Sequence, residues 1–360
     1  MENLIEVDDH RRRKAELSLA NVVMCLLVIF IHVSSEPVTF LLKDSWQYIA
    51  VATATHLGGF AVPGFIFLSG LKLFLHHGDA IHYLSFYKRR FIVVIIPYIV
   101  WFCVYFIYFY LNHYVVMDIG AMAKSFFLGT LVSPFYFVVV IAQFYLFMPL
   151  WRWWLKKDRP LTALFIAFVL MMISKSLPQL LSAIFPAWHF SYSNVLFSSY
   201  LFFWVGGCLA GKYYELFFRV LFRYARLLLL VLPAIATTDT VLWFLSMEGN
   251  IPAFWLNLAR MSYCAFAICA LLFMAKTYRT WSFLGSGFFK TLDRAAYQIF
   301  LSHSLMIFIV DRFLNNYAVV SYGSRYLIRI IVTYAVTVTL CMAWQLLKER
   351  LILVSAKKIT

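Results

Sequence analysis

The chain has 360 residues, of which 63% are hydrophobic and 13% are charged, and its formal net charge is +15. Soluble domains carry roughly 25% charged residues, so this composition excludes a single core in water. An all-α protein that uses lipid as part of its solvent is expected.

A helix that crosses a bilayer needs about 20 mostly apolar residues. Ten runs meet this requirement, so the sequence predicts a polytopic membrane helix bundle of about ten transmembrane helices. The runs cover residues 17–35, 48–74, 91–112, 132–154, 161–179, 194–212, 225–246, 255–275, 294–313 and 326–347.

The positions of Lys and Arg predict the orientation, because cytoplasmic loops carry an excess of these residues. With the N-terminus inside, six clusters of four, 24 residues, fall on the inner side and 7 of the total of 31 fall outside. Both termini are therefore expected to be cytoplasmic, as tails of residues 1–16 and 348–360 around one membrane domain, residues 17–347. Topology explains the positive charge, so nucleic acid is not expected as a partner.

The first run carries an imidazole, His32, and a carboxylate, Glu36, four residues later. A helix places such a pair on one face, and ionisable groups within membrane segments mark functional sites. His32 is expected in the outer half of the membrane, where a neutral imidazole can take a proton from a hydroxyl while Glu36 holds its tautomer. The alternatives are a structural histidine and a carboxylate that only begins an outer loop.

Basic residues at the inner end of the third run, Lys88, Arg89 and Arg90, provide a second candidate site. Arginine binds phosphate bidentately, so Arg89 and Arg90 can dock a phosphate-bearing donor. The alternative is that they only anchor the helix on the positive side of the membrane.

Polar residues inside later apolar runs are candidates for a substrate pathway or for helix packing. In the second run, Pro63-Gly64 permits a kink and Ser69-Gly70 permits close approach of a helix or ligand. The other candidates are Gln143 and Tyr145 in the fourth run, and Ser302 and His303 in the ninth.

Several familiar motifs do not occur in the sequence. The six cysteines all lie in apolar runs without a CxxC pair, which predicts neither a disulfide framework nor a metal site. The chain has no P-loop, GxGxxG, HExxH or EF-hand loop, so a nucleotide-driven pump is not supported.

Taken in order, these stretches resemble the acyltransferase 3 family of membrane acyltransferases. The matching segments are LLVIFIH ending at His32, VPGFIFLSG, Arg90 ahead of Pro97-Tyr98, FVVVIAQFYLFMPL and IFLSH ending at His303. The fourth of these looks closest to members from exopolysaccharide operons, such as those making poly-N-acetylglucosamine.

The resemblance implies about ten helices and an O-acyltransferase in the bacterial plasma membrane. No bound cofactor is expected, and acetyl-CoA or succinyl-CoA would be the donor substrate. The other expected partners are membrane lipid, a glycan acceptor such as a surface or exported polysaccharide, and a polysaccharide synthase complex. His32 would act as the base.

The sequence departs from the family at two places. The family usually has arginine eleven residues before its histidine, where this chain has Asn21, and histidine and tryptophan where it has Pro134 and Tyr136. Because Asn21 carries no charge, Arg13 or Arg90 is expected to take the place of the missing arginine in donor binding; the alternative is that this member has a non-catalytic role. The alternative functions are a transporter of polysaccharide or lipid-linked glycan without acyl chemistry, and a scaffold for a synthase.

Overall fold

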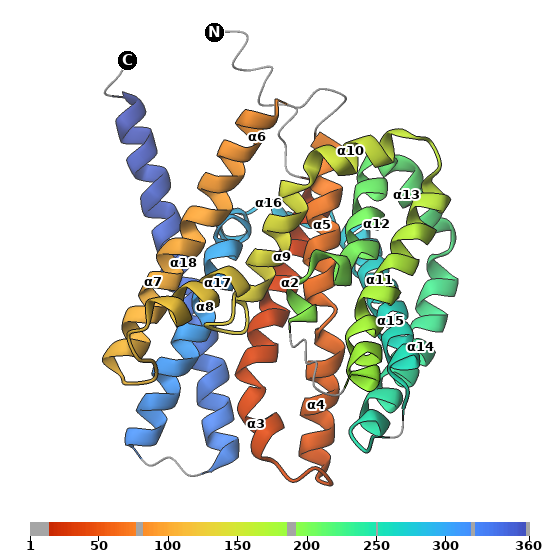
Figure 1. Cartoon of the computed structure of the whole chain (residues 1–360). Coiled ribbons are helices and arrows are strands. Elements are labelled where there is room, and N and C mark those ends of the chain that lie inside the picture. The colour runs from red at the N-terminus through yellow and green to blue at the C-terminus, as the bar shows by residue number, and fades with distance from the viewer. Residues whose placement is uncertain (1–13, 77–81, 186–191, 250, 318–320, 358–360) are drawn as a thin grey trace. The chain divides into compact units, whose positions relative to one another are not determined.

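The computed structural model describes residues 14–76, 82–185, 192–249, 251–317 and 321–357, and within these ranges every regular element is helical (Figure 1). The helices form two compact units. The central unit is Val62–Phe273, and the terminal unit combines Lys14–Ala61 with Met274–Thr360.

The central unit contains most of the helices. They are α5 (Ala61–His76), α6 (Tyr83–Arg90), the π-helix η1 (Phe91–Ile95), α7 (Ile96–Leu111), α8 (Ile119–Leu128), α9 (Phe135–Leu146), α10 (Met148–Lys156), α11 (Pro160–Ile184), the 3₁₀ turns η2 (Ser193–Val195) and η3 (Phe197–Tyr200), α12 (Leu201–Lys212), α13 (Tyr214–Arg223), α14 (Ala225–Ser246) and α15 (Ala253–Thr277).

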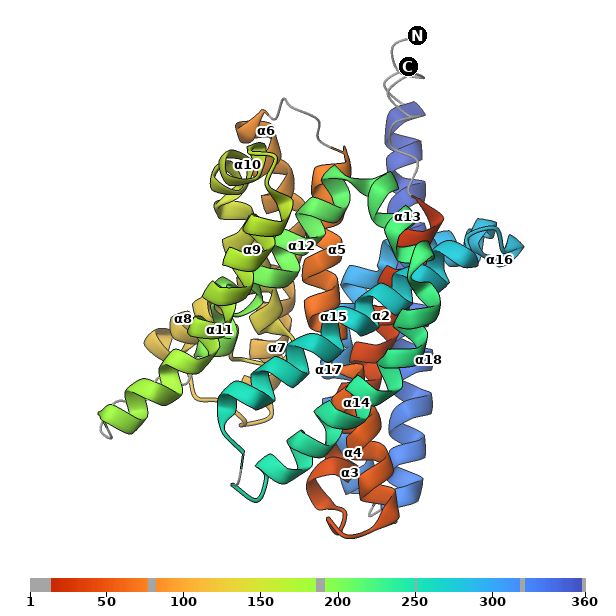
Figure 2. The same cartoon turned by 90° about the vertical axis from the view of Figure 1, so that its right-hand side faces the viewer.

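The terminal unit packs α2, the first described helix, against α17 and α18. Its helices are α2 (Ala15–Val33), α3 (Ser35–Phe40), α4 (Trp46–Gly58), α16 (Ser282–Gly285), α17 (Gly287–Asn316) and α18 (Tyr322–Lys357). Helices α17 and α18 lie side by side along much of their length (Figures 1 and 2). The Tyr334 hydroxyl of α18 donates to the Leu26 carbonyl of α2, at 2.6 Å.

Eight helices of the described residues are long and apolar enough to cross a membrane, and the bent pair α9–α10 makes nine. They coincide with nine of the ten predicted runs, so the all-α polytopic class is confirmed. The exception is the run 194–212. There, η2 and η3 precede α12, which has only 12 residues and is shorter than a continuous span requires.

The irregular backbone before α12 is satisfied by side chains, as non-helical backbone within a membrane protein must be. The Gln143 amide nitrogen donates to the Val195 carbonyl at 2.8 Å, and its oxygen accepts from the Phe197 amide at 3.1 Å. The Ser199 hydroxyl donates to the Ser193 carbonyl at 2.7 Å. Gln143 therefore has the packing role that the sequence left open beside substrate contact.

Helices α5 and α12 approach closely because both present glycine at their contact. A Cβ on Gly70 would lie 2.8 Å from the Trp204 carbonyl oxygen. A Cβ on Gly207 would clash with the Phe67 carbonyl, and the same holds for Gly211 and the Leu71 carbonyl. The sequence predicted that either a helix or a ligand approaches Ser69-Gly70 closely, and the neighbour of Gly70 is helix α12.

Helices α6, α10 and α13 lie at one end of the central unit (Figure 1), and each carries basic residues, among them Arg90, Lys156 and Arg219. Lys212 donates to the Leu155 carbonyl at 3.1 Å and pairs with Asp158 at 2.8 Å. Hydrogen bonds from Lys212 and Tyr213 lower the pKa of the exposed Asp158 carboxyl. The side of the membrane that this end faces and the positions of the two tails stay predictions.

Replacing Gly207 with alanine should destabilise the fold by about 3 kcal/mol, because the new methyl overpacks a backbone contact that cannot yield. Thermal unfolding of the purified protein in detergent measures this change. The matched control is Gly285→Ala, since a Cβ there meets nothing within 4 Å and should shift stability by no more than about 0.5 kcal/mol. Equal stability of the two variants would contradict the close α5–α12 contact.

Candidate active site

His32 lies at the end of α2 and faces His303 of α17, with 5.1 Å between the ring centroids. The His32 side chain is half-buried, and neither ring nitrogen makes a hydrogen bond with a described residue. A neutral imidazole in this state keeps a lone pair available, which is the requirement for a general base.

His303 differs from His32 because both of its nitrogens have partners. Its Nδ1 lies 3.2 Å from the Ile299 carbonyl oxygen and its Nε2 lies 3.3 Å from the Ser304 hydroxyl. A carbonyl only accepts, so these partners place the proton on Nδ1 and leave Nε2 to accept from Ser304. The fully buried His303 therefore has the bonding of a structural histidine, and its place in a substrate pathway stays a prediction.

Ser302 is also engaged within the terminal unit. Its hydroxyl lies 3.3 Å from the Cys341 Sγ atom of α18 and 3.4 Å from the Ile299 carbonyl oxygen. The residue is buried, so its contacts are those of interhelical packing.

Glu36 lies in the short helix α3, directly after the helix of His32. Helix α2 ends at Val33, and Ser34, whose φ and ψ are α-helical, joins it to α3, so that residues 15–40 form one candidate membrane span. The Glu36 carboxylate accepts from two arginines of α18, Arg325 Nε at 2.6 Å and Arg329 Nη1 at 2.9 Å. Its partnership with the His32 ring stays a prediction.

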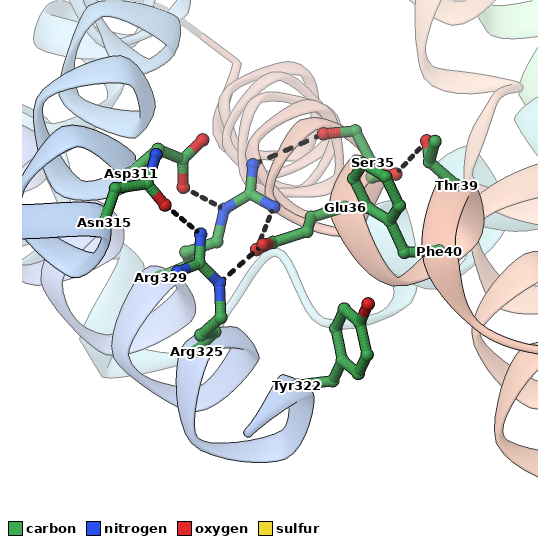
Figure 3. Close-up of a pocket in the computed structure, with 9 residues that line it drawn as sticks. All are labelled: Ser35, Glu36, Thr39, Phe40, Asp311, Asn315, Tyr322, Arg325 and Arg329. Atoms are coloured by element: carbon green, nitrogen blue, oxygen red, sulfur yellow. Dashed lines mark hydrogen bonds and ion pairs between the residues drawn. The ribbon is translucent and has the colours of Figure 1, made fainter. Parts of the chain in front are cut away.

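Arg329 is the centre of this ion-pair cluster (Figure 3). Its side chain is only 2% exposed, and besides Glu36 it pairs through Nε with Asp311 Oδ1 at 3.0 Å. Its Nη2 lies 3.4 Å from the Ser35 hydroxyl. A buried guanidinium is stable only when paired, so Glu36 and Asp311 hold α3 and α17 against α18.

Arg325 and Arg329 are two of the seven basic residues that the charge distribution places outside, and the sequence patterns did not single out Asp311. Two signals were present in the sequence. Arg325 and Arg329 are four residues apart, which places them on one helix face, and Asp311 is a carboxylate within an apolar segment.

In the central unit, Arg90 lies over two aromatic rings. Its guanidinium carbon is 4.7 Å from the centroid of Tyr145 and 5.4 Å from that of Phe86. No described carboxylate forms an ion pair with it, and its buried Nε has no hydrogen-bond partner. The aromatic faces hold the cation in place and leave its charge available to an anionic group.

The backbone directly after Arg90 is a π-helix, Phe91–Ile95, in which the Ile96 amide donates to the Phe91 carbonyl. Pro97 follows and has no N–H to donate, so the regular α-helical hydrogen-bond pattern is interrupted at this point. Such π segments are common at functional sites.

The remaining predicted residues are placed as follows. Arg89 is exposed at the end of α6, and the half-buried Ser69 makes no hydrogen bond with a described residue. Arg13 lies outside the described residues. Asn21 donates to Asp293 Oδ1 at 2.9 Å, and Ser18 donates to Asp293 Oδ2 at 2.8 Å.

The fold and these polar groups define a multi-pass membrane helix bundle with an imidazole available for acid–base chemistry. The chain matches the acyltransferase 3 family, an acyltransferase domain, over residues 15–344. It therefore belongs to this family and is a membrane acyltransferase. No curated protein and no solved structure matches the chain.

Replacing Glu36 with glutamine should destabilise the terminal unit by about 3 kcal/mol, because it removes a carboxylate from a buried guanidinium. Denaturation of the purified protein, followed by circular dichroism, measures the loss. The control is Glu349→Gln, which breaks the more exposed Arg294–Glu349 pair and should cost no more than about 1 kcal/mol. A smaller loss for Glu36→Gln than for the control would contradict the role of the cluster.

Proposed function

We propose that this protein transfers an acyl group, acetyl or succinyl, from cytosolic acyl-CoA to a hydroxyl of a surface or exported polysaccharide. It would act in the plasma membrane of a bacterium. The observation that carries the proposal is the available ring of His32, in a chain whose residues 15–344 match an acyltransferase family.

The proposed chemistry needs one base and one acyl thioester. His32 takes the proton of the acceptor hydroxyl as the hydroxyl oxygen attacks the acyl carbonyl, and a tetrahedral intermediate forms. The carbon–sulfur bond then breaks, the thiolate of coenzyme A leaves, and the proton passes to it, so that the products are an ester and a free thiol. His303, fixed through Ile299 and Ser304, would keep the His32 ring oriented.

The donor site is proposed at the Arg90 end of α6. Coenzyme A carries phosphates, and a guanidinium without an acidic partner suits them better than one in an ion pair. Arg90 has this property, Tyr145 supports it from one face, and Arg89 adjoins it. Arg13, which lies outside the described residues, is proposed as a further phosphate contact because Asn21 carries no charge.

The rival function, a glycan transporter without acyl chemistry, predicts that the glycan is relocated and its acyl content unchanged. Family membership supports the acyltransferase instead. The resemblance to members from exopolysaccharide operons makes poly-N-acetylglucosamine and similar glycans the acceptors to test first, together with association with a synthase complex.

Replacing His32 with alanine should abolish acylation of the polysaccharide, because it removes the group proposed to take the proton of the acceptor hydroxyl. Mass spectrometry of the surface polysaccharide from a deletion strain carrying the variant measures acyl content. Membrane abundance should equal that of the wild type, and His82→Ala, a change at the exposed residue that precedes α6, should leave acylation intact. Full acylation by the His32 variant would refute its role as the base.

Replacing Arg90 with alanine should raise the KM for acyl-CoA by roughly 10- to 100-fold, the loss expected for one charge-assisted contact. The KM for the glycan should stay unchanged in membrane vesicles. If Arg90 binds a phosphate, the variant should also discriminate less between acyl-CoA and its 3′-dephospho form. Arg219→Ala, at an exposed arginine of α13, is the control, and an equal effect there would indicate general electrostatics only.

A further inference from the structure

A cavity of about 570 Å³ opens beside the ion-pair cluster in the terminal unit (Figure 3). It is formed by α3, the end of α17 and the start of α18. Its lining residues are Ser35, Glu36, Thr39, Phe40, Asp311, Asn315, Tyr322, Arg325 and Arg329. The charge distribution of the sequence predicts that this end faces the outside of the cell, where a glycan would arrive.

Two aromatic rings form one wall of the cavity. Phe40 and Tyr322 have nearly parallel planes, 20° apart, with 6.5 Å between their centroids. Both side chains are exposed, at 61% and 49%. Aromatic faces beside a few directed polar groups are typical of small-ligand sites, and such faces accept the apolar C–H surface of a sugar ring.

The polar groups of the cavity divide into those already engaged and those still available. The Arg329 guanidinium and the Glu36 carboxylate are engaged with each other and with their neighbours. Asp311 uses Oδ1 for Arg329, and its Oδ2 has no partner among the described residues. Asn315 uses its oxygen for Arg325, which leaves its NH₂ group as a donor, and the Tyr322 hydroxyl can donate or accept.

The charges of the cavity compensate one another. Two guanidinium groups, Arg325 and Arg329, face two carboxylates, Glu36 and Asp311, in three ion pairs. A phosphate or carboxylate ligand would compete with carboxylates that already hold the arginines. A ligand with hydroxyls and no charge can use the free acceptor of Asp311 and the free donor of Asn315 without breaking any pair.

The cavity also lies near the proposed base. Ser35 follows His32 by three residues. Asp311 follows His303 by eight residues on the continuous helix α17, or about 12 Å at 1.5 Å per residue. We infer that this cavity is the acceptor subsite of the enzyme and that it binds a neutral sugar residue adjacent to the one acylated at His32. The inference rests on the proposed function.

Direct binding to the purified full chain in lipid nanodiscs, by saturation-transfer NMR, tests the inference. The probes are short neutral oligosaccharides of N-acetylglucosamine and of glucose, and a glucuronate-containing hyaluronan oligosaccharide as the anionic comparison. The neutral probes should bind more tightly than the anionic one. Tyr322→Ala should weaken neutral binding by about tenfold, whereas Tyr322→Phe, which keeps the ring, should retain it.

The matched control is Tyr317→Ala, which removes an exposed tyrosine at the end of α17 that does not line the cavity, and its affinity should equal that of the wild type. Preference for the anionic probe, no binding of any neutral probe, or equal effects of Tyr322→Ala and Tyr317→Ala would each overturn the inference.

Failure of this inference is distinguishable from failure of the proposed function. The His32→Ala variant should bind the neutral probes like the wild type, while losing acyl transfer. Loss of acyl transfer in that variant together with unaltered binding by Tyr322→Ala would leave the function standing and refute this subsite. The converse result is also possible. If neutral binding depends on Tyr322 but deletion of the protein leaves glycan acylation unchanged, the cavity is supported as a sugar site and the proposed acyl transfer is refuted.

Discussion

The terminal unit depends on compensating one buried charge. Arg329 is 2% exposed, and an uncompensated guanidinium at that depth is strongly destabilising. Glu36 and Asp311 compensate it from two other helices, and Glu36 is 293 positions away in the sequence. The same ion pairs bring α3, α17 and α18 together around a polar cavity whose net charge is close to zero, so the structural requirement also determines which ligands suit the cavity.

Polar groups elsewhere in the bundle mostly serve one another. Gln143 satisfies irregular backbone before α12, Asn21 and Ser18 donate to Asp293, and His303 uses both ring nitrogens. His32 differs, because its nitrogens have no described partner although its ring lies against His303. A polar group that the fold does not use is the natural place for chemistry in a membrane bundle.

Much of the fold could be predicted from the sequence, because the length of an apolar run is a local property. Nine of the ten predicted runs coincide with spans long enough for a bilayer. The run 194–212 failed because composition does not show where serine-rich backbone leaves the α-helix. The candidate site was predicted less completely: the His32–His303 contact joins two residues named from their motifs, whereas Asp311 and the arginines of α18 were not recognised as part of one cluster.

The sequence by itself determined the class of the protein and the positions of nine of its ten predicted spans, since hydropathy acts along short stretches of chain. Only the tertiary structure decided which partner each polar side chain has. It paired Glu36 with Arg325 and Arg329, and it placed His32 against His303 while leaving the nitrogens of His32 available. The contacts of Glu36 join positions 289 and 293 residues apart, and their energies depend on burial that exists only in the folded bundle.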